Sequence, residues 1–256
     1  MKRVLIVLVA NCLLACGGGS GDSNRLIVVP EVRNDVPGGI WTGTDSDDNS
    51  IVAFADDDGA FYIVSGDFAE SSGLLTISNR QTVSGIMFLA QKVGTNFPGL
   101  DPLTDCSLSG TLIEHESLTL DVKCRLEASQ QVLTTLTLKL DARYERGSSL
   151  ATTAGVFDYE FANALNIATD GAIFGQDSTS GCISNGVISL INTLYNLYRI
   201  ELSFSNCSGQ DGILNGEFFA GLAVLDGTVD PEQLIIALSG DVDGTNVSFV
   251  SYASRL

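Results

Sequence analysis

The chain has 256 residues, of which 13 are basic and 31 are acidic, so its formal net charge at pH 7 is −18. Such an excess of negative charge repels nucleic acids and anionic lipid headgroups, which excludes nucleic acid as a partner. The length is sufficient for one large domain or for two small ones.

The first sixteen residues contain the three parts of an export signal. Residues 1–3 (MKR) are positively charged, residues 4–10 are mostly apolar, and residues 13–16 read LLAC. The apolar run is too short to remain in a bilayer as a spanning helix, so the pattern predicts a cleaved signal peptide over residues 1–15. The remaining chain has 11 basic and 31 acidic residues, which gives a net charge of −20.

The LLAC sequence resembles the lipobox of bacterial lipoproteins. The resemblance implies that Cys16 becomes the first residue of the mature protein and carries acyl groups such as palmitate. Several acyl chains anchor a protein firmly, because each buried methylene contributes about 0.8 kcal/mol. Gly17 follows the cysteine in place of an aspartate, which by analogy with the family favours the outer membrane. A plain secretory peptide with a chance cysteine is the alternative.

The segment after the cysteine predicts a tether. Residues 17–24 read GGGSGDSN, a composition that behaves as a flexible linker. We therefore expect residues 16–35 to connect the lipid to the folded part of the chain. The protein would then be anchored to the bacterial outer membrane, on either its periplasmic face or its surface face.

The remainder reads as two related β domains, over residues 36–146 and 147–256. Each domain opens with a similar tripeptide, GIW at residues 39–41 and GVF at residues 155–157, and each later contains a C-x3-G pattern. Matches in the same order indicate an internal duplication. Period-two alternation and frequent Asn-Gly and Asp-Gly turns predict about eight antiparallel strands in each half. The expected fold class is all-β, with each meander forming a small barrel or a sandwich. One transmembrane barrel of sixteen strands is a weaker alternative.

The cysteine count predicts two disulfides. Of six cysteines, Cys12 leaves with the signal peptide and Cys16 is assigned to the lipid, so four remain. An even number in an exported chain favours disulfides, and the duplication selects one of the three possible pairings. The predicted bonds are Cys106–Cys124 and Cys182–Cys207, each closing a loop that contributes roughly 3 kcal/mol.

An acidic stretch resembles half of a calcium-binding loop. Asp45, Asp47, Asn49 and Asp56 occupy positions one, three, five and twelve of that template, but Ser50 stands where the template has glycine. Two interpretations stay open. The four residues bind Ca²⁺, or they belong to two solvated acidic turns.

The GIW tripeptide resembles the opening strand of the calycin barrels, which include the lipocalins. The resemblance implies that Trp41 packs across one barrel end and that Arg143, from the last strand of the first half, lies over its ring as a cation–π partner. In the alternative interpretation Trp41 is an ordinary core residue.

The motifs of common enzymes are absent from the sequence. It contains no G-x-S-x-G and no P-loop, and His115 is the only histidine. We therefore expect no catalysis, but a binding or interaction module for another protein, a small apolar ligand or a glycan. The alternatives are an envelope hydrolase that uses paired carboxylates and a structural accessory protein of the envelope.

Overall fold

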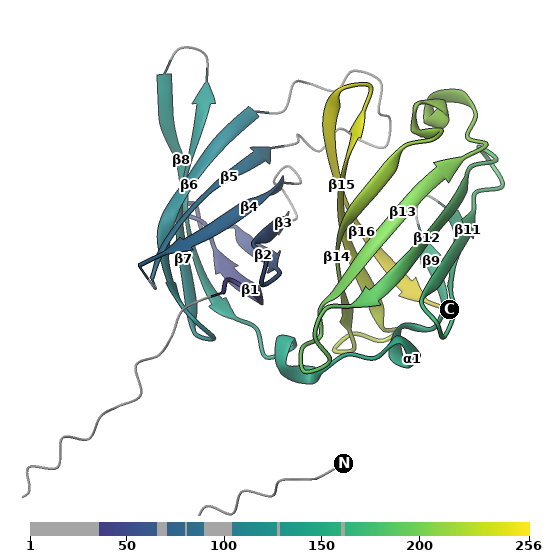
Figure 1. The fold of residues 1–256 in the computed structure, drawn as a ribbon, viewed down its shortest axis with the longest axis horizontal. Coiled ribbons are helices and arrows are strands. Elements are labelled where there is room, and N and C mark those ends of the chain that lie inside the picture. The colour runs from purple at the N-terminus through teal and green to yellow at the C-terminus, as the bar shows by residue number, and fades with distance from the viewer. Residues whose placement is uncertain (1–35, 66–70, 80, 90–103, 127–128, 160–161) are drawn as a thin grey trace, which may run out of the picture. The chain divides into compact units, whose positions relative to one another are not determined.

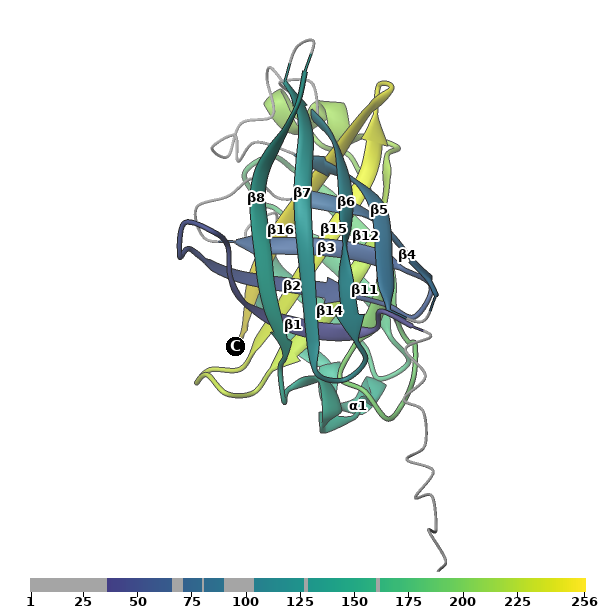
Figure 2. The ribbon, with the colours of Figure 1, turned by 90° about the vertical axis from the view of Figure 1, so that its left-hand side faces the viewer.

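Eight strands with alternating inward and outward side chains form the first half of the protein. The computed structural model describes residues 36–65, 71–79, 81–89, 104–126, 129–159 and 162–256. The strands are β1 (Gly39–Thr44), β2 (Ser50–Ala55), β3 (Ala60–Ser65), β4 (Ser71–Ser78), β5 (Thr82–Leu89), β6 (Thr104–Ile113), β7 (Ser117–Leu126) and β8 (Ser129–Leu140). Each strand pairs antiparallel with the next, and β1 also pairs with β8, so the sheet closes into a barrel (Figure 1). Figure 2 looks onto the side of this first barrel that β5 to β8 form.

The second half repeats this architecture. Its strands are β9 (Gly155–Tyr159), β10 (Ala162–Ile167), β11 (Ala172–Gln176), β12 (Ile183–Leu190), β13 (Tyr198–Ser205), β14 (Phe218–Asp226), β15 (Gln233–Val242) and β16 (Thr245–Arg255). Pairing of β16 with β9 closes this second barrel. The all-β prediction with two tandem antiparallel meanders is confirmed, and the meanders form barrels rather than sandwiches. The sixteen strands close as two barrels and not as one.

A short helical segment connects the two barrels. It contains the 3-10 turn η1 (Tyr144–Arg146) and the single-turn helix α1 (Leu150–Thr153). Ser149 caps α1, because its side chain accepts a hydrogen bond from the Thr152 N–H. The predicted boundary after residue 146 lies between these two elements. Among the described residues, no helix is long and apolar enough to cross a membrane.

Large apolar side chains occupy the interior of each barrel. Trp41 and Phe61 are fully buried in the first barrel, and Phe157, Tyr198 and Phe219 are at most 1% exposed in the second. These residues belong to the inward-facing half of the period-two pattern, which explains why the alternation predicted the strands. Burial of each such side chain stabilises the fold by roughly 1.5–3 kcal/mol.

The opening glycine of each barrel makes room for a neighbouring side chain. A Cβ added at Gly39 would lie 2.7 Å from the indole of Trp41, which donates a hydrogen bond to the Pro37 carbonyl. At Gly155, whose φ is +151°, a Cβ would lie 2.5 Å from the guanidinium of Arg255. The shared tripeptide therefore serves to pack an aromatic side chain at the start of each barrel.

Each barrel contains one disulfide, as predicted. Cys106 and Cys124 are directly opposite each other on β6 and β7, whereas Cys182 and Cys207 flank the β12–β13 hairpin. These hairpins are not equivalent, because they are the sixth and seventh strands of one barrel and the fourth and fifth of the other. The two copies therefore correspond at their opening strands, but the cysteine hairpin is shifted by two strands.

Candidate functional site

The outer faces of the two barrels meet in an apolar layer. Both barrels belong to one compact unit, Arg33–Leu256. Ile40 and Phe54 are opposite each other on β1 and β2 and point away from the interior that Trp41 occupies. The layer, which we call the interface core, consists of Ile40, Phe54, Tyr62, Val64, Tyr144, Leu197, Leu222, Val224, Ile235 and Ala237. Because every member is at most 7% exposed, the barrels pack as one body.

Hydrogen bonds accompany this apolar contact. The Tyr62 hydroxyl donates to the Ala220 carbonyl at 3.1 Å and lies 3.1 Å from the Ser239 hydroxyl. The hydroxyls of Ser72 on β4 and Ser248 on β16 are 2.7 Å apart. Polar groups that become buried between the barrels are thus paired across the interface, which avoids the cost of leaving them unsatisfied.

Two arginines form ion pairs between the barrels. Arg143, in the connecting segment, binds Asp141 beside it and Asp226 at the end of β14. Burial raises the pKa of Asp226, but the hydrogen bonds from Thr228 and the charge of Arg143 outweigh it and lower that pKa overall. Arg199 on β13 of the second barrel binds both Asp56 and Asp58 in the β2–β3 turn of the first, at 3.1 and 3.2 Å.

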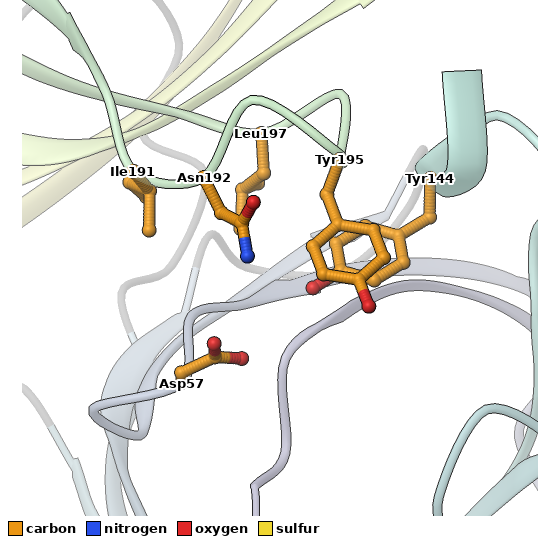
Figure 3. Close-up of a pocket in the computed structure, with 6 residues that line it drawn as sticks. All are labelled: Asp57, Tyr144, Ile191, Asn192, Tyr195 and Leu197. Carbon is orange, nitrogen blue, oxygen red and sulfur yellow. The ribbon is translucent and has the colours of Figure 1, made fainter. Parts of the chain in front are cut away.

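A small pocket lies between the β2–β3 turn and the segment that joins β12 to β13. Its lining consists of Asp57, Tyr144, Ile191, Asn192, Tyr195 and Leu197, and its volume is about 10 Å³ (Figure 3). A space of this size accommodates one group as large as a water molecule. In Figure 3 the side chains of Asp57 and Asn192 approach from opposite sides, with the tyrosines beside them. This pocket is the candidate functional site.

Two stacked tyrosines form one side of the pocket. The rings of Tyr144 and Tyr195 are 4.3 Å apart at their centroids and only 4° from parallel. Burial, and then the negative charge of Asp57, raises the pKa of Tyr144 above its usual range. The Tyr144 phenol therefore remains neutral at physiological pH and can donate or accept hydrogen bonds.

The Asp57 carboxylate is in a negatively charged environment. Burial, and then the charges of Asp56 and Asp58, raises the pKa of Asp57. A Cβ added at Gly38 would lie 2.0 Å from Asp57 Oδ1 and 2.9 Å from the Tyr144 hydroxyl, so both oxygens lie over this glycine. Within the described part of the chain, no hydrogen bond or ion pair satisfies the Asp57 carboxylate.

His115 lies near the tyrosines. It occupies the β6–β7 turn with a φ of +57°, and its ring centroid is 5.8 Å from that of Tyr195. Its ring nitrogens lie 3.7 Å from Glu114 and 3.8 Å from Glu145. The His115 side chain is 38% exposed and lies near Glu145 in the connecting segment.

The structure does not bring the predicted calcium ligands together. Asp45 accepts hydrogen bonds from the backbone N–H groups of Asp47 and Asn49, so it forms a closed turn before β2. Asp56 follows the same strand and binds Arg199. A strand of six residues, Ser50–Ala55, therefore separates the two ends of the supposed loop. The calcium-loop interpretation is wrong, because its ligands would be at opposite ends of an extended strand.

The prediction that Arg143 lies over the ring of Trp41 is wrong. Arg143 lies beyond the end of β8 and directs its guanidinium to Asp141 and Asp226. The predicted kind of contact occurs in the second barrel, where Arg255 lies over the ring of Phe157 at 4.7 Å. Cys16, the signal peptide and the tether at residues 16–35 lie outside the described residues.

The sequence did not indicate the pocket itself. Asp57, Tyr144 and Asn192 come from three segments that are far apart in the chain, so no local motif unites them. The one local signal was the asparagine at position 192, a residue type that favours turns. In the structure its side chain accepts a hydrogen bond from the Leu194 N–H and so forms an Asx turn. This signal predicts a turn but does not predict what the turn faces.

Comparison with known proteins gives no family for this chain. No protein-family model matches it, and searches of curated proteins and of solved structures found no match either. The resemblances of the LLAC and GIW sequences to lipoproteins and calycins therefore remain hypotheses.

Proposed function

We propose that this protein is a lipoprotein of the bacterial cell envelope that binds a partner and does not catalyse a reaction. A lipid on Cys16 anchors the chain to the outer membrane, and residues 16–35 link the lipid to the barrels. The two barrels act together as the binding body. The cysteine assignment rests on the resemblance to the lipobox, whereas the binding role rests on the barrels.

The observation that carries the binding role is the occupied interior of both barrels. A barrel that transports an apolar ligand needs space inside, but bulky side chains such as Trp41, Phe157 and Phe219 occupy these interiors. The surfaces left for recognition are then the outer faces and the contact zone between the barrels. This favours an interaction module over a carrier of small apolar molecules.

The four carboxylates near the pocket that bind arginine suit a binding protein better than a hydrolase. A hydrolase with two carboxylates needs one that is protonated and one that is ionised. Asp56 and Asp58 form ion pairs with Arg199. Asp141 and Asp226 form ion pairs with Arg143, and at both carboxyls hydrogen bonds outweigh burial and lower the pKa. The contacts that surround these acids therefore suit structural ion pairs.

Metabolic labelling tests the anchor. Cells that express the full chain are grown with a clickable palmitate analogue, and the envelope is separated into inner and outer membranes. We expect label in the outer-membrane fraction, and no label when Cys16 is replaced by alanine. The Cys12→Ala variant is the matched control and should retain the label. Label on neither protein would contradict lipidation.

Site-specific photocrosslinking tests the binding role in the same cells. A crosslinking residue is placed at Ile86 or Phe174, which are 57% and 48% exposed on the two barrels, or at Val224, which is fully buried in the interface core. We expect an adduct of defined mass from at least one exposed position and none from Val224. Anchored protein that gives no intermolecular adduct from either exposed position would contradict a protein partner.

A further inference from the structure

We propose that the pocket between Asp57 and Asn192 binds one hydroxyl group of a saccharide. This inference rests on the proposed binding function and names a class of ligand for it. Three features of the pocket support it. One wall accepts hydrogen bonds, the opposite wall donates them, and the space between holds a single small group.

The accepting wall belongs to the first barrel. Asp57 extends from the β2–β3 turn, and among the described residues nothing donates a hydrogen bond to its carboxylate. The turn is held in place on both sides of Asp57, because Asp56 and Asp58 bind Arg199. The carboxylate is therefore positioned and has acceptor capacity for a ligand.

The donating wall belongs to the segment between β12 and β13. Asn192 Oδ1 accepts the Leu194 N–H at 3.0 Å, and this bond fixes the orientation of the side-chain amide. The Nδ2 group of Asn192 is consequently directed toward Asp57 across the pocket (Figure 3). A ligand group between them can accept a hydrogen bond from Asn192 and donate one to Asp57.

These two walls select the chemical group. A hydroxyl both donates and accepts, so it satisfies Asp57 and Asn192 together. An ammonium group only donates and would leave the Asn192 N–H without an acceptor, whereas a carboxylate or phosphate only accepts and would meet the negative charge of Asp57. The volume of about 10 Å³ admits one hydroxyl, so the rest of the ligand remains outside.

The other lining residues suit a sugar ring next to that hydroxyl. Ile191 and Leu197 provide apolar contact, and Tyr195 is only half-buried, while its stacking partner Tyr144 is 3% exposed. Pyranose rings present C–H groups beside their hydroxyls, so a site that combines aromatic, apolar and polar groups matches them. The site exists only while the barrels are packed together, because each contributes one wall.

The test uses residues 17–256 secreted into the periplasm, which include the whole compact unit Arg33–Leu256. The probes are the methyl glycosides of glucose, galactose and mannose, with methylammonium and acetate as ionic comparisons. The side-chain amide resonance of Asn192 is followed by NMR during each titration. We expect one or more glycosides to shift it with a Kd of about 1 mM, and the ions to leave it unchanged.

Two variants locate the binding, and their titrations are followed by the backbone amide resonance of Tyr195, because Asn192→Asp lacks the side-chain amide. Asn192→Asp removes the donor but keeps an oxygen for the Leu194 N–H, and Asp57→Ala removes the acceptor. Each should weaken glycoside binding about tenfold or more, because Asp57→Ala removes a hydrogen bond to a charged group and Asn192→Asp replaces the donor with a second negative charge. Asn185→Asp, at an exposed position on β12, adds the same charge as Asn192→Asp and should bind like the unchanged protein. Near-equal thermal midpoints show that the variants are folded.

The alternatives give different results. A response of the Asn192 amide to methylammonium and not to glycosides would overturn the proposal in favour of a cation site. No response to any probe would show that the pocket holds only water, which also overturns it. Equal weakening by Asn185→Asp would place the sugar elsewhere. Crosslinked adducts in cells without glycoside binding would leave the proposed binding function standing and reject only the saccharide.

Discussion

The ring of Tyr144, from the segment that connects the barrels, lies parallel to the ring of Tyr195, from the second barrel, with their centroids 4.3 Å apart. The Tyr144 carbonyl also accepts a hydrogen bond from the Asn196 N–H at 2.7 Å. The connecting segment is therefore part of the interface core and not a free linker. This contact fixes the second barrel against the first and forms one side of the pocket.

Replacing Tyr144 with alanine should weaken the packing between the barrels. The variant loses a buried aromatic side chain and its stacking partner, and we expect the free energy of unfolding to fall by about 2–4 kcal/mol. Urea denaturation followed by circular dichroism measures this. Phe174→Ala, at an exposed aromatic position of the second barrel, is the control and should change stability by less than about 0.5 kcal/mol. Equal losses of unfolding free energy in the two variants would show that the stacked tyrosines do not stabilise the contact between the barrels.

Loss of the Arg143 ion pairs should reduce stability at neutral pH much more than at acidic pH. Arg143→Met leaves Asp141 and Asp226 without their cation, and we expect a loss of about 2 kcal/mol at pH 7. Both carboxyls have lowered pKa values, so their contribution is complete above about pH 4, the pKa of an unfolded aspartate, and disappears as the pH falls through their folded values.

Urea titrations at pH 7 and at pH 2.5 distinguish this outcome from a packing effect. The difference between the unchanged protein and Arg143→Met should shrink at the lower pH, provided that both remain folded there. Arg146→Met, three residues further along the connecting segment, is the matched control. A difference that stays constant with pH would indicate that the aliphatic part of Arg143, rather than its charge, stabilises the interface.

Removing either disulfide should destabilise the protein without changing the order of its strands. The bonds connect cysteines 18 and 25 residues apart, so each is expected to contribute about 3 kcal/mol. Cys106→Ser with Cys124→Ser, and separately Cys182→Ser with Cys207→Ser, tests this by urea denaturation. Added reductant should lower the stability of the unchanged protein and have no effect on a variant that lacks all four cysteines. Equal stability of all forms would contradict the estimate.

The sequence predicted the strands and the disulfides, which depend on residues that are close together in the chain. Period-two alternation identified the strands because inward positions had to be apolar. The duplication gave the disulfide pairs, and in the structure each pair joins the two sides of one hairpin. The same information could have excluded the calcium loop. Residues 50–55 (SIVAFA) are a short apolar run that is typical of a strand buried on both faces, and a strand between Asp45 and Asp56 keeps their carboxylates apart.

Contacts between distant segments could not be predicted in this way. Arg143 is 83 residues from Asp226, and Asp56 is 143 residues from Arg199, so nothing in the local pattern pairs them. The pocket depends on the same long-range packing, because Asp57 and Asn192 are brought together only when the interface core forms. The duplicated tripeptides identified equivalent opening strands, yet the shifted cysteine hairpin shows that the copies diverged beyond them.

A methyl group at Gly39 should disturb the single tryptophan of the protein. The added Cβ of Gly39→Ala would lie 2.7 Å from the Trp41 indole and 2.9 Å from Leu140, so the ring has to move. We expect a red shift of the fluorescence emission and a stability loss of about 1–3 kcal/mol, which is typical of overpacking. Gly212→Ala, whose new Cβ would meet only one backbone oxygen at 3.9 Å, should leave the spectrum unchanged. An unchanged spectrum for Gly39→Ala would contradict the close contact.

Neutralising Asp57 should stabilise the protein at neutral pH. Burial and the charges of Asp56 and Asp58 raise the pKa of Asp57, so its ionised form is less favourable in the folded than in the unfolded protein. Asp57→Asn removes this cost, and because the turn is partly solvated we expect a gain below about 1 kcal/mol. The gain should vanish as the pH falls below about 4, since the carboxyl is then protonated in both states. Asp170→Asn, in the corresponding turn of the second barrel, is the control. A loss of stability in Asp57→Asn at pH 7 would show that the Asp57 carboxylate has a stabilising partner.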